Sequence, residues 1–335
     1  MLILGIESSC DETSCALVRD GREVLSNEIY TQIPIHVEYG GVVPEIASRN
    51  HLIKISDVVD LALAKASCAF EDVDAIAVTM GPGLVGALLV GVNYAKALSY
   101  ALNKPLIGVN HLKGHLLSPL LSYPELEPPY MGLVVSGGNS YLAICKDYDD
   151  LEVVGTSRDD ALGEAYDKVA RTLGFEYPGG PKIDAAAKRG NGSAISFPRV
   201  YLEPDSLDFS FSGIKTAVLN HINSEKQRGN ENLNREDIAA SFQEAVLEVL
   251  VSKSIRACSR YEIDRLVVSG GVAANSRLRE LFHQESGKHG IEMYYPAFEY
   301  CTDNAAMIAS AAYYVAALDR EEALRLNADP ALKLA

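Results

Sequence analysis

The chain has 335 residues, of which 48% are hydrophobic and 22% are charged, and these globular values exclude a disordered or low-complexity protein. Its length suffices for two lobes, because single hydrophobic cores stop growing near ~250–300 residues. With 30 basic and 45 acidic side chains the net charge is −15, so the chain lacks the basic surplus of a protein that binds nucleic acid unaided. An RNA ligand would therefore require a local basic patch or a partner protein.

The N-terminal sequence MLILGIESSCDE contains only a short apolar run and no basic segment, so we expect no signal peptide. Other apolar runs are broken by charge, Gly or Pro before they reach the ~20 residues of a membrane span. The six cysteines are scattered without a Cys-x-x-Cys pair, which disfavours a disulfide framework and a thiolate zinc site. We therefore expect a soluble, cytoplasmic protein with free thiols.

Three segments have the pattern of a strand, a tight polar turn, and a second strand or a helix. They lie at residues 2–18, 132–145 and 265–282. The string Leu-Val-Val-Ser-Gly-Gly occurs in two of them, beginning at Leu133 and at Leu266. We interpret the repeat as a pair of phosphate-facing turns in an α/β protein.

Strands and helices alternate between these turns, which predicts sheets covered by helices on both faces. A strand at 75–80 leads into an apolar helix that ends at Leu102, and a strand at 105–110 leads into a helix with two histidines. A segment rich in Pro and Glu, 124–129, predicts a domain boundary. The remaining expected elements are helices over 160–173 and 237–258, a strand over 291–295, and a final helix over 304–318 with Thr302 or Asp303 as its N-cap.

The two histidines, His111 and His115, are four residues apart, so on a helix they share one face and can bind one metal ion. A further ligand is needed, and Asp303 at a strand–helix junction is the best-placed carboxylate. The alternatives are an ordinary polar surface for the histidines and a helix cap for the aspartate. A zinc peptidase of the His-Glu-x-x-His type needs a glutamate after the first histidine, and Leu112 stands there instead.

The segment 81–86 fits the pattern Gly-x-Gly-x-x-Gly between a strand and a helix. A dinucleotide-binding fold also needs an acidic residue at the end of the next strand, which here ends in Asn110 and His111. We therefore favour a tight turn with close helix–sheet packing.

The turns at 136–138 and 269–271 can present backbone N–H groups to an anion, and Asn275 beside the second could hold a ribose or an adenine. Together with an acidic turn at Asp11 and Glu12, which we place on the phosphate side, they predict a nucleotide site.

One side of the expected helix 160–173 carries Asp160, Glu164 and Asp167, most simply a solvated face. Asp167 is a candidate ligand-binding residue because a rigid Gly-rich turn and Asp184 follow it. Two carboxylates that flank such a turn could accept hydrogen bonds from a polar ligand.

With these motifs assembled, the chain resembles the bacterial tRNA N6-adenosine threonylcarbamoyltransferase family (TsaD, formerly the glycoprotease family). The similar stretches run in order from residue 5 to about residue 307: GIESSCDET, HVEYGGVVPEIASR, GPGLVGALLVG, VNHLKGH, VVSGG, GEAYDKVARTLGFEYPGGP, FSFSGIKTAV, VVSGGVAANSRLRE and CTDNAAM.

The resemblance implies an α/β, actin-like and sugar-kinase-like (ASKHA) fold with two ribonuclease-H-like lobes around a nucleotide cleft. The lobes would be 1–125 and 126–300, with 301–335 packing back on the first. The implied reaction transfers threonylcarbamoyl from threonylcarbamoyl-AMP to the N6 amine of adenosine 37 in tRNAs that read ANN codons.

The resemblance also implies ligands and partners. One divalent metal per subunit, Fe²⁺ or Zn²⁺, would be held by His111, His115 and Asp303. Partners would be tRNA, a non-catalytic TsaB-like paralogue and a small TsaE-like ATPase. The chain would form a homo- or heterodimer and would not bind a membrane. The site for threonylcarbamoyl-AMP, or for ATP, ADP or AMP, would comprise Val134, Val135, Ser136, Gly137, Gly138, Asp167, Gly180, Asp184 and Asn275.

The chain departs from the family pattern at several positions. Asn139-Ser140 replaces the usual His-Thr, Lys113 stands where a glutamate is common between the histidines, Leu162 replaces an alanine, and Tyr166 replaces a phenylalanine. Lys113, two positions past His111, should point away from the ligand face. The alternatives are an ATP-hydrolysing sugar-kinase-like or chaperone-like protein, a metallopeptidase, and a scaffold subunit without chemistry.

Overall fold

Two compact units make up the chain in the computed structural model, which describes residues 1–230 and 233–334. Unit 1 contains Met1–Pro128, Lys146–Leu151 and the chain from Tyr295 onward. Unit 2 contains Pro129–Cys145 and Glu152–Tyr294. Each unit is built around one five-stranded sheet.

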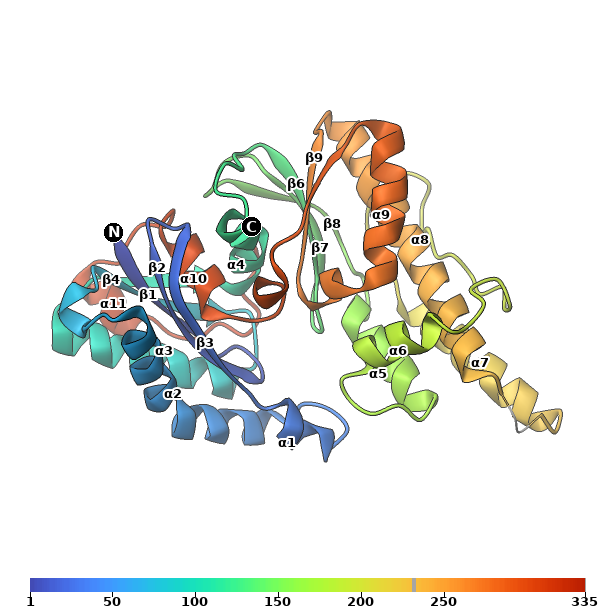
Figure 1. Ribbon diagram of the computed structural model, residues 1–335, viewed down its shortest axis with the longest axis horizontal. Coiled ribbons are helices and arrows are strands. Elements are labelled where there is room, and N and C mark those ends of the chain that lie inside the picture. The colour runs from blue at the N-terminus through green and yellow to red at the C-terminus, as the bar shows by residue number, and fades with distance from the viewer. Residues whose placement is uncertain (231–232, 335) are drawn as a thin grey trace. The chain divides into compact units, whose positions relative to one another are not determined.

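The sheet of unit 1 has the strand order β3-β2-β1-β4-β5 (Figure 1). β1 pairs antiparallel with β2 and parallel with β4, and β4 pairs parallel with β5. The carboxyl ends of β1, β4 and β5 therefore lie at one edge of the sheet. The strands are β1 (Leu2–Glu7), β2 (Glu12–Arg19), β3 (Glu23–Thr31), β4 (Ala75–Gly81) and β5 (Leu106–Asn110).

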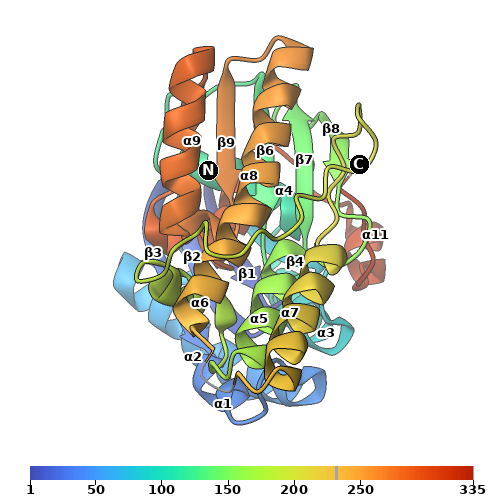
Figure 2. The ribbon, with the colours of Figure 1, turned by 90° about the vertical axis from the view of Figure 1, so that its right-hand side faces the viewer.

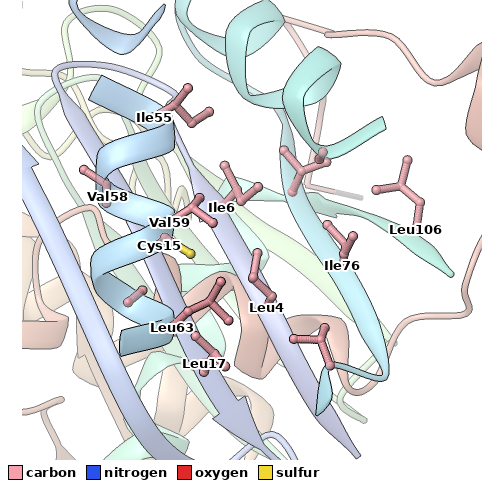
Figure 3. Close-up of a cluster of buried hydrophobic side chains, with 14 of the residues drawn as sticks. Leu4, Ile6, Cys15, Leu17, Ile55, Val58, Val59, Leu63, Ile76 and Leu106 are labelled. Atoms are coloured by element: carbon pink, nitrogen blue, oxygen red, sulfur yellow. The ribbon is translucent and has the colours of Figure 1, made fainter. Parts of the chain in front are cut away.

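The core of unit 1 lies between this sheet and the helices α2 (Pro44–Ala66) and α3 (Val85–Leu102). All six residues of β1 are buried, as expected for a strand with both faces covered. Figure 3 shows Ile55, Val59 and Leu63, one face of α2, against side chains of the sheet. Each such aliphatic side chain contributes roughly 1.5–3 kcal/mol when it is buried. The other face of β1 and β2 packs against α10 (Ala305–Ala312).

Helix α3 has 18 residues and a mean hydropathy of 1.3, so by length and composition alone it could cross a membrane. One such helix is weak evidence for a span, because core helices of soluble proteins have the same character. Its residues Ala87, Leu88 and Val92 are buried, and α3 packs against α2 and β4. This packing accounts for its apolar face.

The sheet of unit 2 repeats the strand order of unit 1 as β8-β7-β6-β9-β10. β6 pairs antiparallel with β7 and parallel with β9, and β9 pairs parallel with β10. The two Ser-Gly-Gly turns follow the neighbouring strands β6 and β9, so they lie at the same edge. The strands are β6 (Tyr130–Val135), β7 (Ser140–Cys145), β8 (Leu151–Thr156), β9 (Arg265–Ser269) and β10 (Glu292–Tyr294).

The long helix α8 (Arg235–Tyr261) is the main buried helix of unit 2, and it lies beside α9 (Ser276–His289), as Figure 2 shows. A second group of helices, α5 (Leu162–Thr172), α6 (Gly179–Ala187) and α7 (Ser212–Gln227), packs together and against α8. The other α-helices within the described residues are α1 (Ile33–Val37), α4 (His111–Leu117) and α11 (Arg320–Arg325).

Most elements expected from the pattern are confirmed, including β4, β5, α5, α8 and β10. The final helix was predicted wrongly at both ends. α10 stops at Ala312 instead of residue 318, and its N-cap is Asn304, whose Oδ1 accepts the Met307 N–H at 3.0 Å. Neither Thr302 nor Asp303 caps it, and the carboxylate of Asp303 is therefore available for other contacts.

Candidate active site

A helix cap presents the two histidines. β5 ends at Asn110, whose Oδ1 accepts the N–H of Leu112 at 2.9 Å and the N–H of Lys113 at 3.3 Å. These bonds satisfy donors that a first helical turn otherwise leaves without partners, so α4 begins immediately after the strand. The predicted helix with His111 and His115 on one face is confirmed.

His111, His115 and Asp303 lie together inside unit 1. Nε2 of His111 is 3.4 Å from Oδ1 of Asp303, and Nε2 of His115 is 3.1 Å from the same oxygen. Three potential ligand atoms, one from each residue, lie within 4.8 Å of one another. Two imidazole nitrogens and a carboxylate oxygen in this arrangement can hold a divalent cation and leave positions for other ligands.

Behind His111 lies a carboxylate that the sequence analysis missed. Oε2 of Glu7, the last residue of β1, is 3.0 Å from Nδ1 of His111, and Glu7 is completely buried. Glu7 also accepts the hydroxyl of Thr79 at 2.6 Å and the N–H of Ser9 at 2.5 Å. A carboxylate on Nδ1 favours the tautomer that presents Nε2 to a metal ion.

His115 lacks a corresponding partner. Among the described residues, its buried Nδ1 has no hydrogen-bond partner. The two histidines meet edge to face, with ring centroids 4.7 Å apart. Packing and Asp303 therefore orient His115, whereas Glu7 orients His111.

The charges of the cluster depend on one another. Burial opposes the charged form of His111, but the carboxylates of Glu7 and Asp303 raise its pKa well above the ordinary value. Burial also opposes ionisation of Asp303, yet the neighbouring histidines hold its pKa far below the ordinary range. Burial lowers the pKa of His115. With a divalent cation bound and both imidazoles neutral, the carboxylates of Glu7 and Asp303 would balance its charge, so the donor set fits such an ion.

Lys113, which departs from the family pattern, forms an ion pair with Asp149. Lys113 is buried, whereas the side chain of Asp149 is mostly exposed. The ammonium group is therefore neutralised by a carboxylate of its own and does not compete with the cation for Asp303.

The acidic turn at Asp11 and Glu12 lies in the electrostatic surroundings of the same centre. Burial, together with the charges of Asp11 and Asp303, raises the pKa of Glu12 well above its ordinary value. Thr31 donates its hydroxyl to Glu12 at 3.1 Å. The assignment of this turn to the phosphate side of a nucleotide stays a prediction.

In unit 2, the turn after β6 is accessible. Gly137 and Gly138 are exposed, and nothing lies within 4 Å of the positions where their Cβ atoms would stand. On the other side, a Cβ on Gly163 of α5 would come within 2.6 Å of Ser136 O and 2.7 Å of Gly137 Cα. The turn therefore rests on α5, and its other side is open.

The predicted carboxylates of unit 2 join neighbouring helices. Asp167 of α5 accepts the N–H of Gly179 at 2.7 Å, so it fixes the start of α6. Asp184 of α6 accepts the hydroxyl of Ser276 at 3.0 Å, so it contacts the start of α9. Gly180 has open space at its Cβ position. Asp167 and Asp184 are thus connected through α6.

Asn275 is nearly buried and uses both ends of its amide. Its Oδ1 accepts the N–H of Leu278 and caps α9, and its Nδ2 donates to Oε1 of Gln243 at 2.8 Å. Gln243, Glu244 and Arg277 line a cavity of about 270 Å³ in unit 2. The predicted adenylate residue Asn275 therefore contacts one wall residue of this cavity, Gln243.

Comparison with known proteins identifies the family. Residues 23–310 match the family described as tRNA N6-adenosine threonylcarbamoyltransferase. A protein of that name from Clostridium botulinum (strain 657 / Type Ba4) is 57% identical over 332 residues, covering 99% of this chain and 97% of the relative. A Clostridium perfringens protein of the same name is 54% identical over 333 residues, covering 99% and 98%. The chain belongs to this family.

Solved structures support the fold of this family member. A full-length HypF structure aligns with a TM-score of 0.63 at 14% identity and covers 93% of this chain and 46% of that one. Component A of the (R)-2-hydroxyglutaryl-CoA dehydratase of Acidaminococcus fermentans aligns with a TM-score of 0.53 at 18% identity, covering 94% and 98%. These similarities and the two mixed sheets confirm the predicted two-lobe, actin-like α/β fold.

Proposed function

We propose that this chain transfers the threonylcarbamoyl group of threonylcarbamoyl-AMP to the N6 amine of adenosine 37 in tRNAs that read ANN codons. The observation that carries the proposal is the cluster of two buried histidines, His111 and His115, with the partly exposed Asp303, in a chain related along 99% of its length to proteins named for this reaction. The cluster offers metal chemistry, and the relatives indicate the group transferred.

His111, His115 and Asp303 would hold one divalent metal, iron or zinc, since both accept imidazole and carboxylate ligands. When bound, the metal supplies Lewis-acid polarisation of a phosphate or carbonyl oxygen. Glu7 keeps the proton of His111 on Nδ1. Asp303 contributes a charge that stays ionised because its pKa is held far below the ordinary range.

The adenylate would bind to unit 2 through Val134, Val135, Ser136, Gly137, Gly138, Asp167, Gly180, Asp184 and Asn275. The donor is a mixed anhydride and already activated, so no protein nucleophile is required. The amine attacks the carbonyl carbon, the bond from that carbon to the phosphate oxygen breaks, and the amine gives up one proton. The backbone of Ser136–Gly138 would stabilise the negative charge on the departing AMP.

The same proposal includes partner subunits of the TsaB-like and TsaE-like types. The chain would be soluble in the cytoplasm and would form a homo- or heterodimer. The net charge of −15 supports a need for partners in tRNA binding. Exposed Leu52 and Ile53 on α2 give unit 1 an apolar surface for a subunit. We assign the predicted lobes, 1–125 with 301–335 and 126–300, to units 1 and 2.

The test is transfer of labelled threonylcarbamoyl from its adenylate to tRNA, with metal-loaded and metal-stripped protein, and with and without the partner subunits. His111→Ala and His115→Ala should each abolish transfer and leave the circular dichroism spectrum unchanged. His283→Ala, on the exposed side of α9, is the matched control and should retain activity. Full transfer by either ligand variant would contradict the metal role.

A further inference from the structure

A cavity of unit 1 lies at the other end of β5 from the histidines. It has a volume of about 310 Å³, and Leu106, the first residue of β5, forms part of its wall. The other walls are the C-terminal half of α3, the turn that follows it, and five residues near the C-terminus: Ala317, Leu318, Arg320, Ala323 and Leu324. Because β5 enters the candidate metal centre at its opposite end, this cavity is separate from that centre.

Three cationic side chains, Lys96, Lys104 and Arg320, line this cavity, and none of the lining residues in the described part of the chain is acidic. Lys96 donates to the carbonyl of Leu326 at 2.9 Å, and Lys104 donates to the carbonyl of Glu71 at 3.0 Å. No ion pair joins any of the three cations to a carboxylate within residues 1–230 and 233–334. Three cationic side chains therefore line one cavity, and within the described residues none of them pairs with a carboxylate.

The acidic side chains that flank Arg320 in the sequence, Asp319, Glu321 and Glu322, are engaged in contacts of their own. Asp319 accepts the N–H groups of Glu321 and Glu322 and so caps the helix, and Glu322 bonds back to the Asp319 N–H. Glu321 pairs with Arg325. The cations of the cavity are therefore available to an anionic ligand.

An aromatic platform stands beside these charges. Tyr100 is 63% exposed, and the guanidinium carbon of Arg320 lies over one face of its ring, 5.6 Å from the centre. Tyrosine rings and arginine planes are surfaces on which unpaired bases stack. The surrounding backbone is fixed, because Leu318 donates its N–H to the carbonyl of Leu106 at 2.9 Å.

We propose that this cavity, which we call the Tyr100 site, binds one nucleotide, with its phosphate at Lys96, Lys104 and Arg320 and its base against Tyr100. Arginine and lysine are the usual partners of phosphate, and the cavity falls in the size range of small-molecule sites. The nucleotide can come from single-stranded RNA or be free. The proposal does not rest on the transfer reaction, and it supplies the local basic patch that the overall charge demands of an RNA-binding chain.

The first test measures binding of fluorescein-labelled hexauridylate by anisotropy, because uridine avoids an adenine-selective site. We expect a dissociation constant of ~1–100 µM for the wild type at physiological salt. Lys104→Glu combined with Arg320→Glu should weaken binding at least ~10-fold and reduce the salt slope by roughly 0.7, the value for one phosphate contact on a single strand. The matched control, Arg49→Glu with Lys54→Glu on α2, makes the same change in net charge. It should leave affinity within about 2-fold.

The second test addresses the base. Tyr100→Ala should weaken hexauridylate ~10-fold, as expected for one stacked base, whereas Tyr100→Phe keeps the ring and should bind like the wild type. A second double variant, Lys104→Gln with Arg320→Gln, removes the two charges without reversing them. A thermal melt of each variant shows whether a loss of binding is due to a loss of folding. The proposal would be overturned if the control double variant on α2 lost as much hexauridylate affinity as the Lys104 and Arg320 double variant. A wild-type dissociation constant weaker than ~1 mM would also overturn it.

Competition with UMP distinguishes the two sources of the nucleotide. If UMP displaces hexauridylate at millimolar concentration, a free nucleotide suffices. If it does not, while binding stays sensitive to the substitutions at Lys104 and Arg320, the Tyr100 site takes its nucleotide from an RNA chain.

Discussion

The role of Glu7 can be tested by Glu7→Gln, which preserves the shape of the side chain and removes its charge. Glu7 accepts three hydrogen bonds, from the Ser9 N–H and from the Thr79 hydroxyl and His111 Nδ1. A glutamine amide has one oxygen and one NH₂ group, and the NH₂ group cannot accept. One of these bonds must therefore fail or reverse.

Both orientations of the glutamine carry a cost. If the NH₂ group faces the Ser9 N–H, that buried donor loses its acceptor at ~1–3 kcal/mol. If it faces His111, it favours the tautomer with the proton on Nε2, which is the ligand atom. Changes in partners of this type reduce metal affinity 10–100-fold, or roughly 1.4–2.7 kcal/mol. We expect a loss in that range for Glu7→Gln.

The assay is a chelator-competition titration with Co²⁺, followed by its visible absorption, which reports metal affinity independently of transfer. The matched control is Thr13→Val, which removes a buried hydroxyl bond of 2.8 Å to Nδ1 of His51, a histidine outside the ligand set. Its metal affinity should equal that of the wild type. If Glu7→Gln binds Co²⁺ as tightly as the wild type, while His115→Ala does not bind it, the orienting role of Glu7 is refuted.

Three further predictions concern other parts of the chain. Burial lowers the pKa of Lys253 to about 8 in the folded chain. Above that pH the unfolded chain holds more of this proton than the folded chain does, so the free energy of unfolding rises with pH. Urea unfolding should show the wild type gaining roughly 1–2 kcal/mol over Lys253→Met between about pH 8 and 9.5, and a constant difference would contradict this. Gly163→Ala should push the Ser136 turn aside and lower the free energy of unfolding by ~1–3 kcal/mol. Calorimetry should show AMP affinity at least ~10-fold weaker, and an unchanged affinity would argue against the turn as the adenylate contact. Asn304→Ala should cost ~0.5–2 kcal/mol in thermal unfolding, since it removes the cap of α10, and an unchanged melting temperature would rule out that cap.

The sequence predicted the buried strands well because their signal is local. β1, β4 and β6 are short apolar runs bounded by polar turns, and nearly all of their residues are buried. No element was predicted between residues 19 and 74, where β3 and α2 lie. β3 is half-buried and rich in polar residues, and α2 carries exposed Leu52 and Ile53 beside its core face. These patterns blur the periodicity on which such predictions depend.

The metal ligands were partly predictable for a similar reason. The spacing of His111 and His115 is a property of one helix, and Asp303 was suggested by its place before another. Glu7 escaped notice because its partner lies 104 residues away, and only the pairing of β1, β4 and β5 brings the two together. The available signal was a charged residue at the end of the otherwise apolar strand LILGIE.

The position of the candidate residues in both units follows from the repeated sheet topology. In unit 1, Glu7 and His111 stand at the carboxyl ends of β1 and β5, which flank β4 in a parallel arrangement. In unit 2, Ser136 and Gly270 follow the parallel neighbours β6 and β9. Ligands of open α/β sheets bind outside the carboxyl ends of parallel strands, because the chain turns there and leaves side chains and backbone groups without a strand partner. The same topology therefore places the histidine–carboxylate cluster of unit 1 and the exposed glycines Gly137 and Gly138 of unit 2 beyond the carboxyl ends of parallel strands.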